Sequence, residues 1–375
     1  MNACNLSKRR GKWQSGGTTW YNHLPPYYEL RAEASLRLCR PLRSVNLSHE
    51  ELYPSVLDAI GGTPLVELSR VSRGLEGRVF AKLEFLNPGY SKKDRIARQM
   101  IEEAEAGGAL GPGDTVVELT SGNTGTGLAI VCAAKGYRFV AVMSRGNSIE
   151  RARMMAALGA EVVLVDQCPE STPGEVSGAD LARVEEKARE IVEQRGAFRA
   201  DQFQLEGNSR AHYQHTAPEI MRQSGGIDAF CDFIGSGGSF AGCARYFKEC
   251  DSAIQCYIVE PAGAAAFAGE TVTRPNHRIQ GGGYAMRDLA LIDRALVDGC
   301  LQVSDADARE MTRRLAKEEG LFAGYSSGAN LAAAFQLLQS AHRGGRIAIL
   351  LPDSGLKYLS TDLWSLGRVD TAPRH

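Results

Sequence analysis

Residues 84–97 read Glu-Phe-Leu-Asn-Pro-Gly-Tyr-Ser-Lys-Lys-Asp-Arg-Ile-Ala and join an extended run to the start of a predicted helix. The dipeptide Asn87-Pro88 marks a turn, and Lys92 and Lys93 stand directly before the predicted helix. A lysine held at such a turn can be positioned and desolvated, which an amine needs in order to form a Schiff base. Taken alone, the stretch is also explained by a solvated pair of lysines at a helix entrance.

Strands and helices alternate along the chain on both sides of this stretch. Apolar runs and helical spacing of apolar residues predict strand 79–83, helix 94–106, strand 116–119, helix 124–135, strand 139–143, helix 148–158, strand 161–165, helix 180–194, strand 229–234, helix 240–249, strand 256–260, helices 305–318 and 327–339, and strand 347–351. This alternation predicts an α/β fold with mostly parallel, doubly wound sheets. Ligands of such sheets bind at the carboxyl ends of the strands, so the loops that follow strands are the candidate sites.

Length and composition bound the class of protein. The 375 residues are enough for two domains, and the net charge of -1 gives no electrostatic reason to expect nucleic acid or an acidic membrane surface. No apolar run approaches the ~20 residues of a membrane-spanning helix. The nine cysteines include no CxxC pair, which favours reduced thiols and a cytoplasmic enzyme. No cysteine or carboxylate cluster accompanies His212 and His215, so we expect no metal site.

The start of the chain differs from the rest. The first 28 residues contain no acidic residue and include Lys8, Arg9, Arg10 and Lys12, but they have no apolar segment of the kind found in secretory signals. We expect residues 1–50 to form a poorly ordered N-terminal extension. An organelle-targeting peptide is the alternative.

Two glycine-containing loops follow predicted strands. In residues 120–125, Thr-Ser-Gly-Asn-Thr-Gly, hydroxyl groups and backbone N–H groups meet at a helix start and suit a carboxylate, although a hydroxyl there can also simply cap the helix. In residues 235–239, Gly-Ser-Gly-Gly-Ser, successive N–H groups can wrap a phosphate at the positive end of the next helix. A dinucleotide site is the rival for the second loop, because Glu260 ends the following strand. The third glycine of that fingerprint is missing, however, since position 240 is Phe240.

Two further segments, residues 324–328 and 352–355, are helix caps or turns when each is considered by itself. A lysine for an imine, a cradle for one phosphate and a cradle for a carboxylate together indicate pyridoxal 5'-phosphate acting on an amino acid.

The chain resembles the cysteine synthase and cystathionine β-synthase branch of the β-family, or fold type II, pyridoxal-phosphate enzymes. The resemblance runs from about residue 55 to residue 361. The matching segments are residues 62–66, 87–95, 120–125, 158–161, 211–213, 218–220, 235–239, 279–281, 326–328 and 352–355. The resemblance implies two doubly wound, three-layer α/β/α domains of the tryptophan synthase β-like architecture. Residues 51–198 would carry the cofactor lysine and the substrate carboxylate loop, and residues 199–375 the phosphate loop.

The resemblance also implies a role for each matching residue. Lys93, which directly precedes Asp-Arg, would be the catalytic lysine and form the internal aldimine. Asn123 would bind the ring oxygen of the cofactor, and Ser326 would face its pyridine nitrogen. Gly235, Ser236, Gly237, Gly238 and Ser239 would hold the phosphate. Thr120, Ser121, Thr124 and Gln202 would hold the substrate carboxylate.

The implied reaction is β-replacement on serine or an O-activated serine through an aminoacrylate, giving cysteine or a related amino acid. A β-eliminating ammonia-lyase or a racemase on the same fold is the alternative. Outside this class, the alternatives are a nucleotide-dependent oxidoreductase and a catalytically silent binding protein. Glycine spacing disfavours the oxidoreductase, and the intact Lys93, Asn123 and glycine loop disfavour the silent protein. By resemblance we expect a homodimer that binds an amino acid and a nucleophilic co-substrate.

Three features depart from the family pattern, namely Tyr90, Lys92 and the segment Gly-Gly-Gly-Tyr-Ala-Met-Arg at residues 281–287, which follows Gln280. Tyr90 and Lys92 replace a small residue and an aliphatic residue, so the substrate entrance is expected to differ and the nucleophile need not be sulfide.

Cys39 and His49 lie in the region where cystathionine β-synthases can carry a haem, but no recognisable motif surrounds them, which favours solvated or packed residues.

Overall fold

The structure is a computed structural model and describes residues 52–364, apart from residues 121, 172–175 and 177. The predicted extension 1–50, with Cys39 and His49, lies outside the described residues, and so does Ser121 of the predicted carboxylate loop. Within the described part of the chain, no helix combines the length and the hydropathy needed to cross a bilayer.

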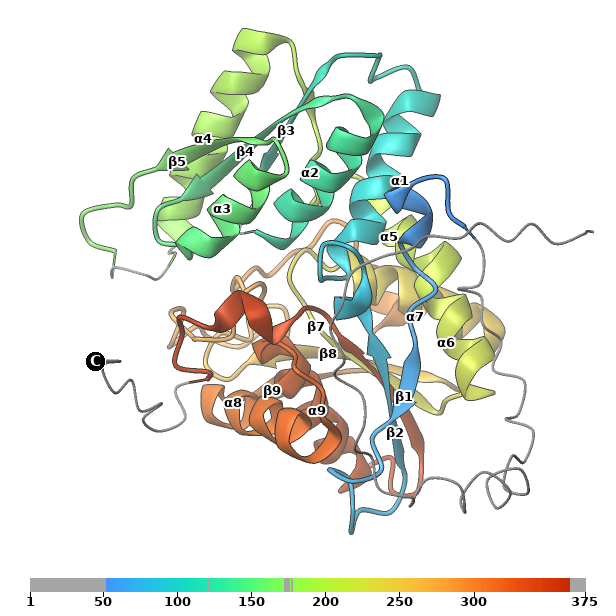
Figure 1. The fold of residues 1–375 in the computed structure, drawn as a ribbon. Helices are drawn as coiled ribbons and strands as arrows, with labels where there is room; N and C mark the ends of the chain where they lie inside the picture. Colours follow the sequence, from blue (N-terminus) through green and yellow to red (C-terminus); the bar gives the residue numbers. More distant parts are fainter. Residues whose placement is uncertain (1–51, 121, 172–175, 177, 365–375) are drawn as a thin grey trace, which may run out of the picture. The chain divides into compact units, whose positions relative to one another are not determined.

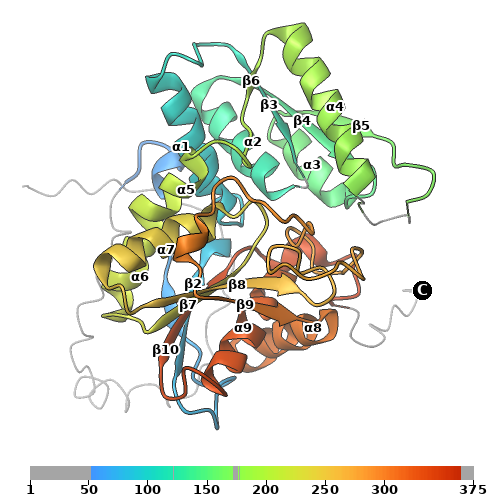
Figure 2. The ribbon, with the colours of Figure 1, turned by 180° about the vertical axis from the view of Figure 1, so that it is seen from behind.

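Six strands form one sheet in the order β1-β2-β10-β7-β8-β9 (Figures 1 and 2). The strands are β1 (Leu65–Glu67), β2 (Arg78–Leu83), β10 (Arg346–Leu351), β7 (Ala229–Phe233), β8 (Gln255–Pro261) and β9 (Gly299–Val303). β1 is antiparallel to β2, and all other neighbours are parallel. Because β10 pairs with both β2 and β7, the segment that leads to the two lysines shares a sheet with distant parts of the chain.

Both faces of this sheet are covered by helices. Along β10, Ile347, Ile349 and Leu351 pack in one core cluster, and Ala348 and Leu350 pack in another. This alternation is the two-residue period of a strand whose two faces are both buried. The first cluster includes residues of α8 (Asp305–Arg314) and α9 (Tyr325–Leu338), and the second includes residues of α6 (Ala217–Ser224) and α7 (Gly238–Cys250).

A second sheet is entirely parallel and has the order β5-β4-β3-β6. Its strands are β5 (Glu161–Val165), β4 (Arg138–Ser144), β3 (Thr115–Leu119) and β6 (Phe198–Arg199). One face packs against α1 (Lys93–Ala106), α2 (Asn123–Lys135) and α3 (Ile149–Ala157), and the other packs against α4 (Gly178–Arg195). Both sheets therefore form the middle of three layers, which confirms the predicted α/β class.

The predicted strands and helices are all present, with small shifts at their ends. The segment predicted as one helix over 305–318 differs in helix type, because the α-helix α8 ends at Arg314 and a π-helix, η6 (Leu315–Glu319), follows. β1, β6, β9, α5 (Gly207–Ala211) and α6 had no counterpart in the sequence prediction. The domain division near residue 198 stays a prediction. β1 and β2 precede it in sequence, yet they pair in the sheet of β7 to β10.

A buried ion network fixes the start of α1. Arg95 Nε lies 2.7 Å from Glu84 Oε2, and Arg95 Nη2 lies 2.8 Å from Glu219 Oε2. Lys82 Nζ lies 2.6 Å from the same Glu219 oxygen, and Thr63 Oγ1 donates to Glu84 Oε1 at 2.7 Å. Glu84 follows β2 and Glu219 lies on α6, so Arg95 joins α1 to elements of the six-stranded sheet region.

We expect Arg95→Met to lower the free energy of unfolding by about 3–5 kcal/mol, because removing one partner leaves buried carboxylates uncompensated. Urea unfolding checks this. Arg195→Met is the matched control, since Arg195 forms an equally bidentate pair with Glu161 whose side chains are 40% and 50% exposed. That control should lose no more than about 1 kcal/mol. Equal losses in the two variants would contradict a special role for the buried network.

Candidate active site

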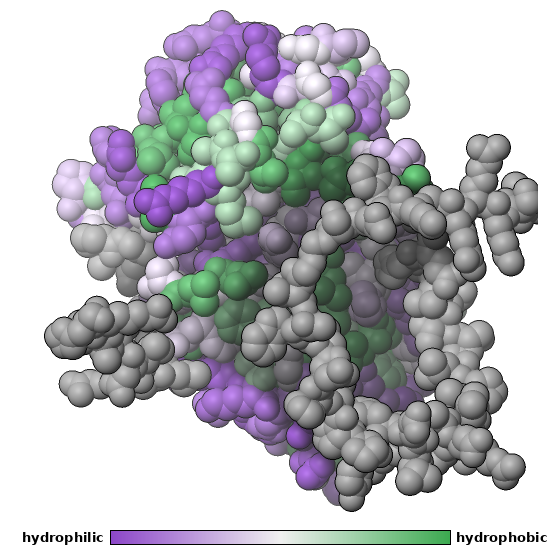
Figure 3. Space-filling model, viewed as in Figure 1, coloured by the Kyte–Doolittle hydropathy of each residue, from purple (hydrophilic) through white to green (hydrophobic). Residues whose placement is uncertain are grey.

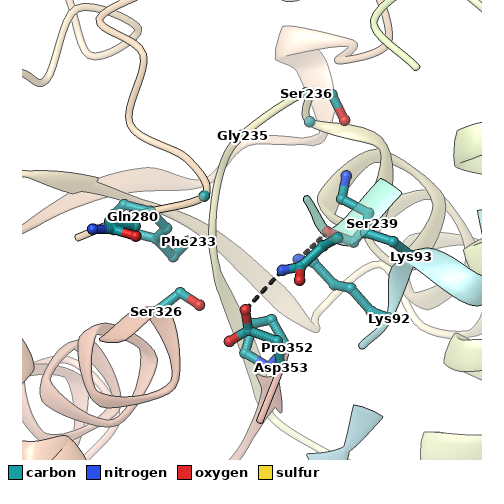
Figure 4. A pocket seen from close by; sticks show the side chains of 13 residues that line it. Lys92, Lys93, Phe233, Gly235, Ser236, Ser239, Gln280, Ser326, Pro352 and Asp353 are labelled. Atoms are coloured by element: carbon teal, nitrogen blue, oxygen red, sulfur yellow. Dashed lines mark hydrogen bonds between the residues drawn. The ribbon is translucent and has the colours of Figure 1, made fainter. Parts of the chain in front are cut away.

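A pocket lies where β7 and β10 end, at the carboxyl edge of the six-stranded sheet (Figure 4). The two lysines at the start of α1 enter it from one side, and Ser326, from the first turn of α9, enters from the other. Its lining residues are Lys92, Lys93, Asn123, Phe233, Gly235, Ser236, Gly237, Ser239, Gln280, Gly281, Ser326, Pro352 and Asp353. Six separate segments therefore converge, as expected for a site built from strand-end loops.

The pocket brings together most of the predicted cofactor residues. They are Lys93, Asn123, Gly235, Ser236, Gly237, Ser239 and Ser326. Gly238, which belongs to the glycine loop 235–239 and is the first residue of α7, is not among the lining residues. Thr120, Thr124 and Gln202, predicted to hold the substrate carboxylate, also lie outside the lining set.

The glycine loop is shaped by backbone requirements at two positions. Gly237 has a φ of 85°, in the left-handed region that favours glycine. A Cβ at Gly238 would lie 2.0 Å from Asn208 Oδ1, so only glycine fits there. Asn208 Nδ2 in turn donates to Ser236 Oγ at 2.9 Å. The loop is thus fixed against α5, and the first N–H groups of α7, which have no partners within the helix, are available to an anion.

Lys93 is the first residue of α1, and its side chain is held by an amide. Nζ donates to Gln202 Oε1 at 3.0 Å, and Thr124 Oγ1 donates to the same oxygen at 2.7 Å. Gln202 Nε2 donates to Glu118 Oε1 at 3.2 Å, which fixes the orientation of the amide. Burial, and then the neighbouring positive charge of Lys92, lower the pKa of Lys93 to about 7. Near neutral pH much of this amine is therefore unprotonated and nucleophilic.

The positive charge of Lys92 is balanced by a carboxylate, whereas the Lys93 amine contacts an uncharged amide. Lys92 Nζ lies 3.1 Å from Asp232 Oδ2 and donates to Ser239 Oγ at 2.7 Å. The Asp232 side chain is fully buried and belongs to β7. Sequence reasoning missed Asp232, although an acidic residue inside the otherwise apolar run 229–234 is a signal that could have found it.

Asn123 is oriented by two residues that follow β10. Its Nδ2 donates to Asp353 Oδ2 at 2.7 Å, and its Oδ1 accepts from Lys357 Nζ at 2.6 Å. A donor on one side and an acceptor on the other settle which amide atom is nitrogen. One N–H of the amide then remains for a ligand in the pocket. Lys357 was missed from the sequence, because a lysine two positions after a turn carries no signal of its own.

Thr120 acts within its own loop. Its Oγ1 accepts from the N–H groups of Gly122 and Gly125 at 3.0 and 2.9 Å, in the first turn of α2. This is the capping arrangement that the sequence left open as an alternative. The hydroxyl hydrogen is not used in either bond, so a donor remains for a ligand.

Tyr90 and Glu260 take structural roles. Tyr90 has a φ of 61°, the residue is 47% exposed, and it does not line the pocket. Its carbonyl accepts from Ser354 N at 3.2 Å, which ties the loop to the segment after β10. The Glu260 carboxylate accepts from Phe267 N at 3.0 Å and Ala268 N at 2.9 Å. The acid that suggested a dinucleotide site therefore holds a backbone turn.

Comparisons with known proteins agree with this arrangement. Residues 56–353 match the model of the family described as "Pyridoxal-phosphate dependent enzyme". The chain is 40% identical over 314 residues to a cysteine synthase of Staphylococcus aureus, covering 83% of this chain and 97% of that protein. It is 40% identical over 319 residues to the O-ureido-L-serine synthase of Streptomyces lavendulae, covering 84% of this chain and 93% of that protein. A crystal structure of O-acetyl serine sulfhydrylase isoform 3 from Entamoeba histolytica superposes with a TM-score of 0.78 at 33% identity, covering 88% and 96% of the two chains.

We expect the reaction of the free Lys93 amine with a brief pulse of acetic anhydride to follow a titration centred at about pH 7. The amine is protonated and inert below that pH and neutral above it, because burial and Lys92 penalise the charge. Mass spectrometry of the Lys93 peptide across a pH series measures the midpoint. In the urea-unfolded chain, the same peptide should titrate near its ordinary value of about 10.4. A midpoint near that value in the folded protein as well would contradict the assignment.

Proposed function

The chain belongs to the family of pyridoxal-phosphate dependent enzymes, and from this premise we propose that it catalyses β-replacement on serine or an O-activated serine. The product would be cysteine or a related β-substituted amino acid. The observation that carries the proposal is that the Lys93 amine, with its pKa lowered to about 7, lies in the same pocket as the glycine loop 235–239. Similarity to a cysteine synthase and to an O-ureido-L-serine synthase supports the reaction class.

The residues of the pocket fit the cofactor. When bound, pyridoxal phosphate supplies an aldehyde that forms an imine with an amine and a ring that withdraws electrons from the α-carbon of an amino acid. In the proposal Lys93 holds the aldehyde carbon, and Gly235, Ser236, Gly237, Gly238 and Ser239 hold the phosphate. The remaining N–H of Asn123 binds the ring oxygen, and the hydroxyl of Ser326 faces the ring nitrogen. The chemistry of these groups supports the proposal. An amine suits the aldehyde, N–H donors suit the phosphate and the ring oxygen, and a hydroxyl suits the ring nitrogen.

The substrate carboxylate is assigned to Thr120, Ser121, Thr124 and Gln202 in the proposal. Gln202 and Thr124 are bonded to each other, and Gln202 also contacts the Lys93 amine, so this group adjoins the reacting lysine. The unused hydroxyl hydrogen of Thr120 and the N–H groups at the start of α2 suit an anion. Ser121 lies outside the described residues and enters by resemblance alone.

Lys93 moves the proton in the proposed reaction. Once the substrate amine has taken its place, Lys93 Nζ is a free amine of depressed pKa and accepts the proton from the substrate α-carbon. The β-substituent leaves, a nucleophile adds at the β-carbon, and Lys93 returns the proton to the α-carbon. Gln202 and Thr124 keep Nζ and the substrate carboxylate on the same side of the pocket.

We expect Lys93→Ala to lower turnover by about 10³-fold or more, since the residue serves as both covalent anchor and general base. The measurement is a panel of serine, O-acetylserine and O-phosphoserine crossed with sulfide, thiols, homocysteine and amines, read by mass spectrometry. Lys135→Ala is the control, because Lys135 pairs with Glu105 away from the pocket. Full turnover in Lys93→Ala would refute the assignment. Release of a keto acid without any nucleophile would instead favour the β-eliminating alternative.

We further propose that the enzyme is a cytoplasmic homodimer that uses an amino acid and a nucleophilic co-substrate. Large apolar side chains lie exposed near the pocket segments, among them Leu86 at 53%, Leu356 at 54% and Leu359 at 61%. Figure 3 shows hydrophobic surface where Figure 1 draws the chain after β10. A second copy covering these side chains would remove them from water. Sedimentation that found only the mass of one chain would argue against the homodimer.

A further inference from the structure

Lys92 is a second lysine in the pocket, and the reaction proposed above gives it no role. Its side chain is 11% exposed, and it lines the same pocket as Lys93 and the glycine loop. Burying an ammonium costs several kcal/mol even after relaxation, and a carboxylate partner offsets that cost only in part. Asp232 supplies the carboxylate, with its two oxygens at 3.1 and 3.3 Å from Nζ.

Ser239 is drawn into this pair and cannot use its hydroxyl elsewhere. Ser239 Oγ donates to Asp232 Oδ2 at 2.5 Å and accepts from Lys92 Nζ at 2.7 Å. A hydroxyl has a single hydrogen, so Ser239 has none left to give a ligand. Its backbone N–H, in the first turn of α7, remains. The loop therefore offers one side-chain donor fewer than its sequence suggests.

Lys92 has a donor to spare at this point. An ammonium carries three N–H groups. One N–H group forms a bifurcated hydrogen bond with the two oxygens of Asp232. A second N–H group donates to Ser239 Oγ. Among the described residues that line the pocket, Lys92 and Lys93 are the cationic side chains. Lys93 is assigned to the aldehyde, so Lys92 is the cation left for the other, anionic end of the cofactor.

A phosphate monoester carries a charge of about −1.5 to −2 near neutral pH. The N-terminus of α7 supplies the equivalent of only about half a positive charge, and the buried carboxylate of Asp232, joined to the loop through Ser239, opposes an incoming anion. A cation is needed to make the electrostatic potential at the loop positive and so favourable to a phosphate. Lys92 is in contact with the loop and is already desolvated.

We propose that Lys92 is a cofactor-binding residue whose ammonium contacts the phosphate of pyridoxal phosphate in place of the Ser239 hydroxyl, with Asp232 as its counter-ion. The inference rests on the proposed function, because it assumes that the phosphate lies on residues 235–239. It adds a role that Lys92 performs without a covalent bond, and it explains why two adjacent lysines enter one pocket.

The test is a titration of the full chain, freed of cofactor with hydroxylamine, with pyridoxal phosphate and separately with pyridoxal, which lacks the phosphate. Lys92→Met should weaken pyridoxal phosphate binding about 10-fold or more, the worth of a charge-assisted hydrogen bond. Pyridoxal binding should change by less than about 3-fold. Inorganic phosphate should compete with pyridoxal phosphate in the wild-type chain and compete less well in the variant.

The double variant Lys92→Met/Asp232→Asn separates the phosphate contact from mere neutralisation of Asp232. It removes both charges, so it folds without an unpaired buried carboxylate even where the single variant does not. The proposal requires that the double variant still bind pyridoxal phosphate weakly. Recovery of wild-type affinity would show that Lys92 only neutralises Asp232, and an equal loss for pyridoxal would show a general disturbance of the pocket. Either result overturns the inference.

Lys248→Met is the matched control, because Lys248 lies on α7 as well and pairs with Asp298 at 2.7 Å at the other end of that helix. It should leave the ratio of the two affinities unchanged. A wild-type chain that bound neither pyridoxal phosphate nor pyridoxal would count against the proposed function itself. Intact wild-type binding with no change in Lys92→Met would count against this inference alone.

Discussion

The start of α1 places three basic side chains within four consecutive positions, at the end of the helix where its dipole is positive. Lys92 and Arg95 are buried there and Lys93 is half-buried, which costs desolvation free energy and is also disfavoured by the dipole. The three are compensated unequally. Arg95 meets Glu84 and Glu219, Lys92 meets Asp232, and Lys93 meets only the neutral amide of Gln202. The chemistry of the site follows from this inequality, because the Lys93 amine forms no direct ion pair with a described residue and its pKa is lowered to about 7 by burial and by the charge of Lys92.

The compensating acids explain why the site needs both sheets. α1 packs against the four-stranded sheet, whereas Asp232 lies on β7, Glu84 follows β2 and Glu219 lies on α6. The ion pairs therefore hold the start of α1 against the edge of the other sheet, where the glycine loop and Asp353 also lie. Lys357 and Asn123 repeat the arrangement on a smaller scale, since a residue after β10 orients one at the start of α2. The pocket therefore combines polar side chains that are held by distant residues with N–H donors that remain for a ligand.

Local signals were sufficient to predict the repeated elements and the loops of the site. Alternating apolar runs and helical spacing predicted both sheets, and the glycines of residues 235–239 predicted a loop that only glycine fits at position 238. Short strands such as β6, with two residues, carry no period to detect. Contacts between distant residues were out of reach for a different reason. Asp232 is 140 positions from Lys92, so nothing local indicates that the pair forms or that it engages the Ser239 hydroxyl. The cap formed by Thr120 shows the remaining ambiguity, because one hydroxyl at a helix start serves the helix and a ligand equally well.

Because only one of the two adjacent lysines is paired with a carboxylate, we expect only the other, Lys93, to form the imine, and one chemical measurement tests this. The purified holoenzyme is reduced with borohydride, which turns an imine into a stable secondary amine, and the digested peptides are sequenced by mass spectrometry. Our account predicts a pyridoxyl group on Lys93 and an unmodified Lys92. A pyridoxyl group on Lys92, on another peptide or on none would contradict it.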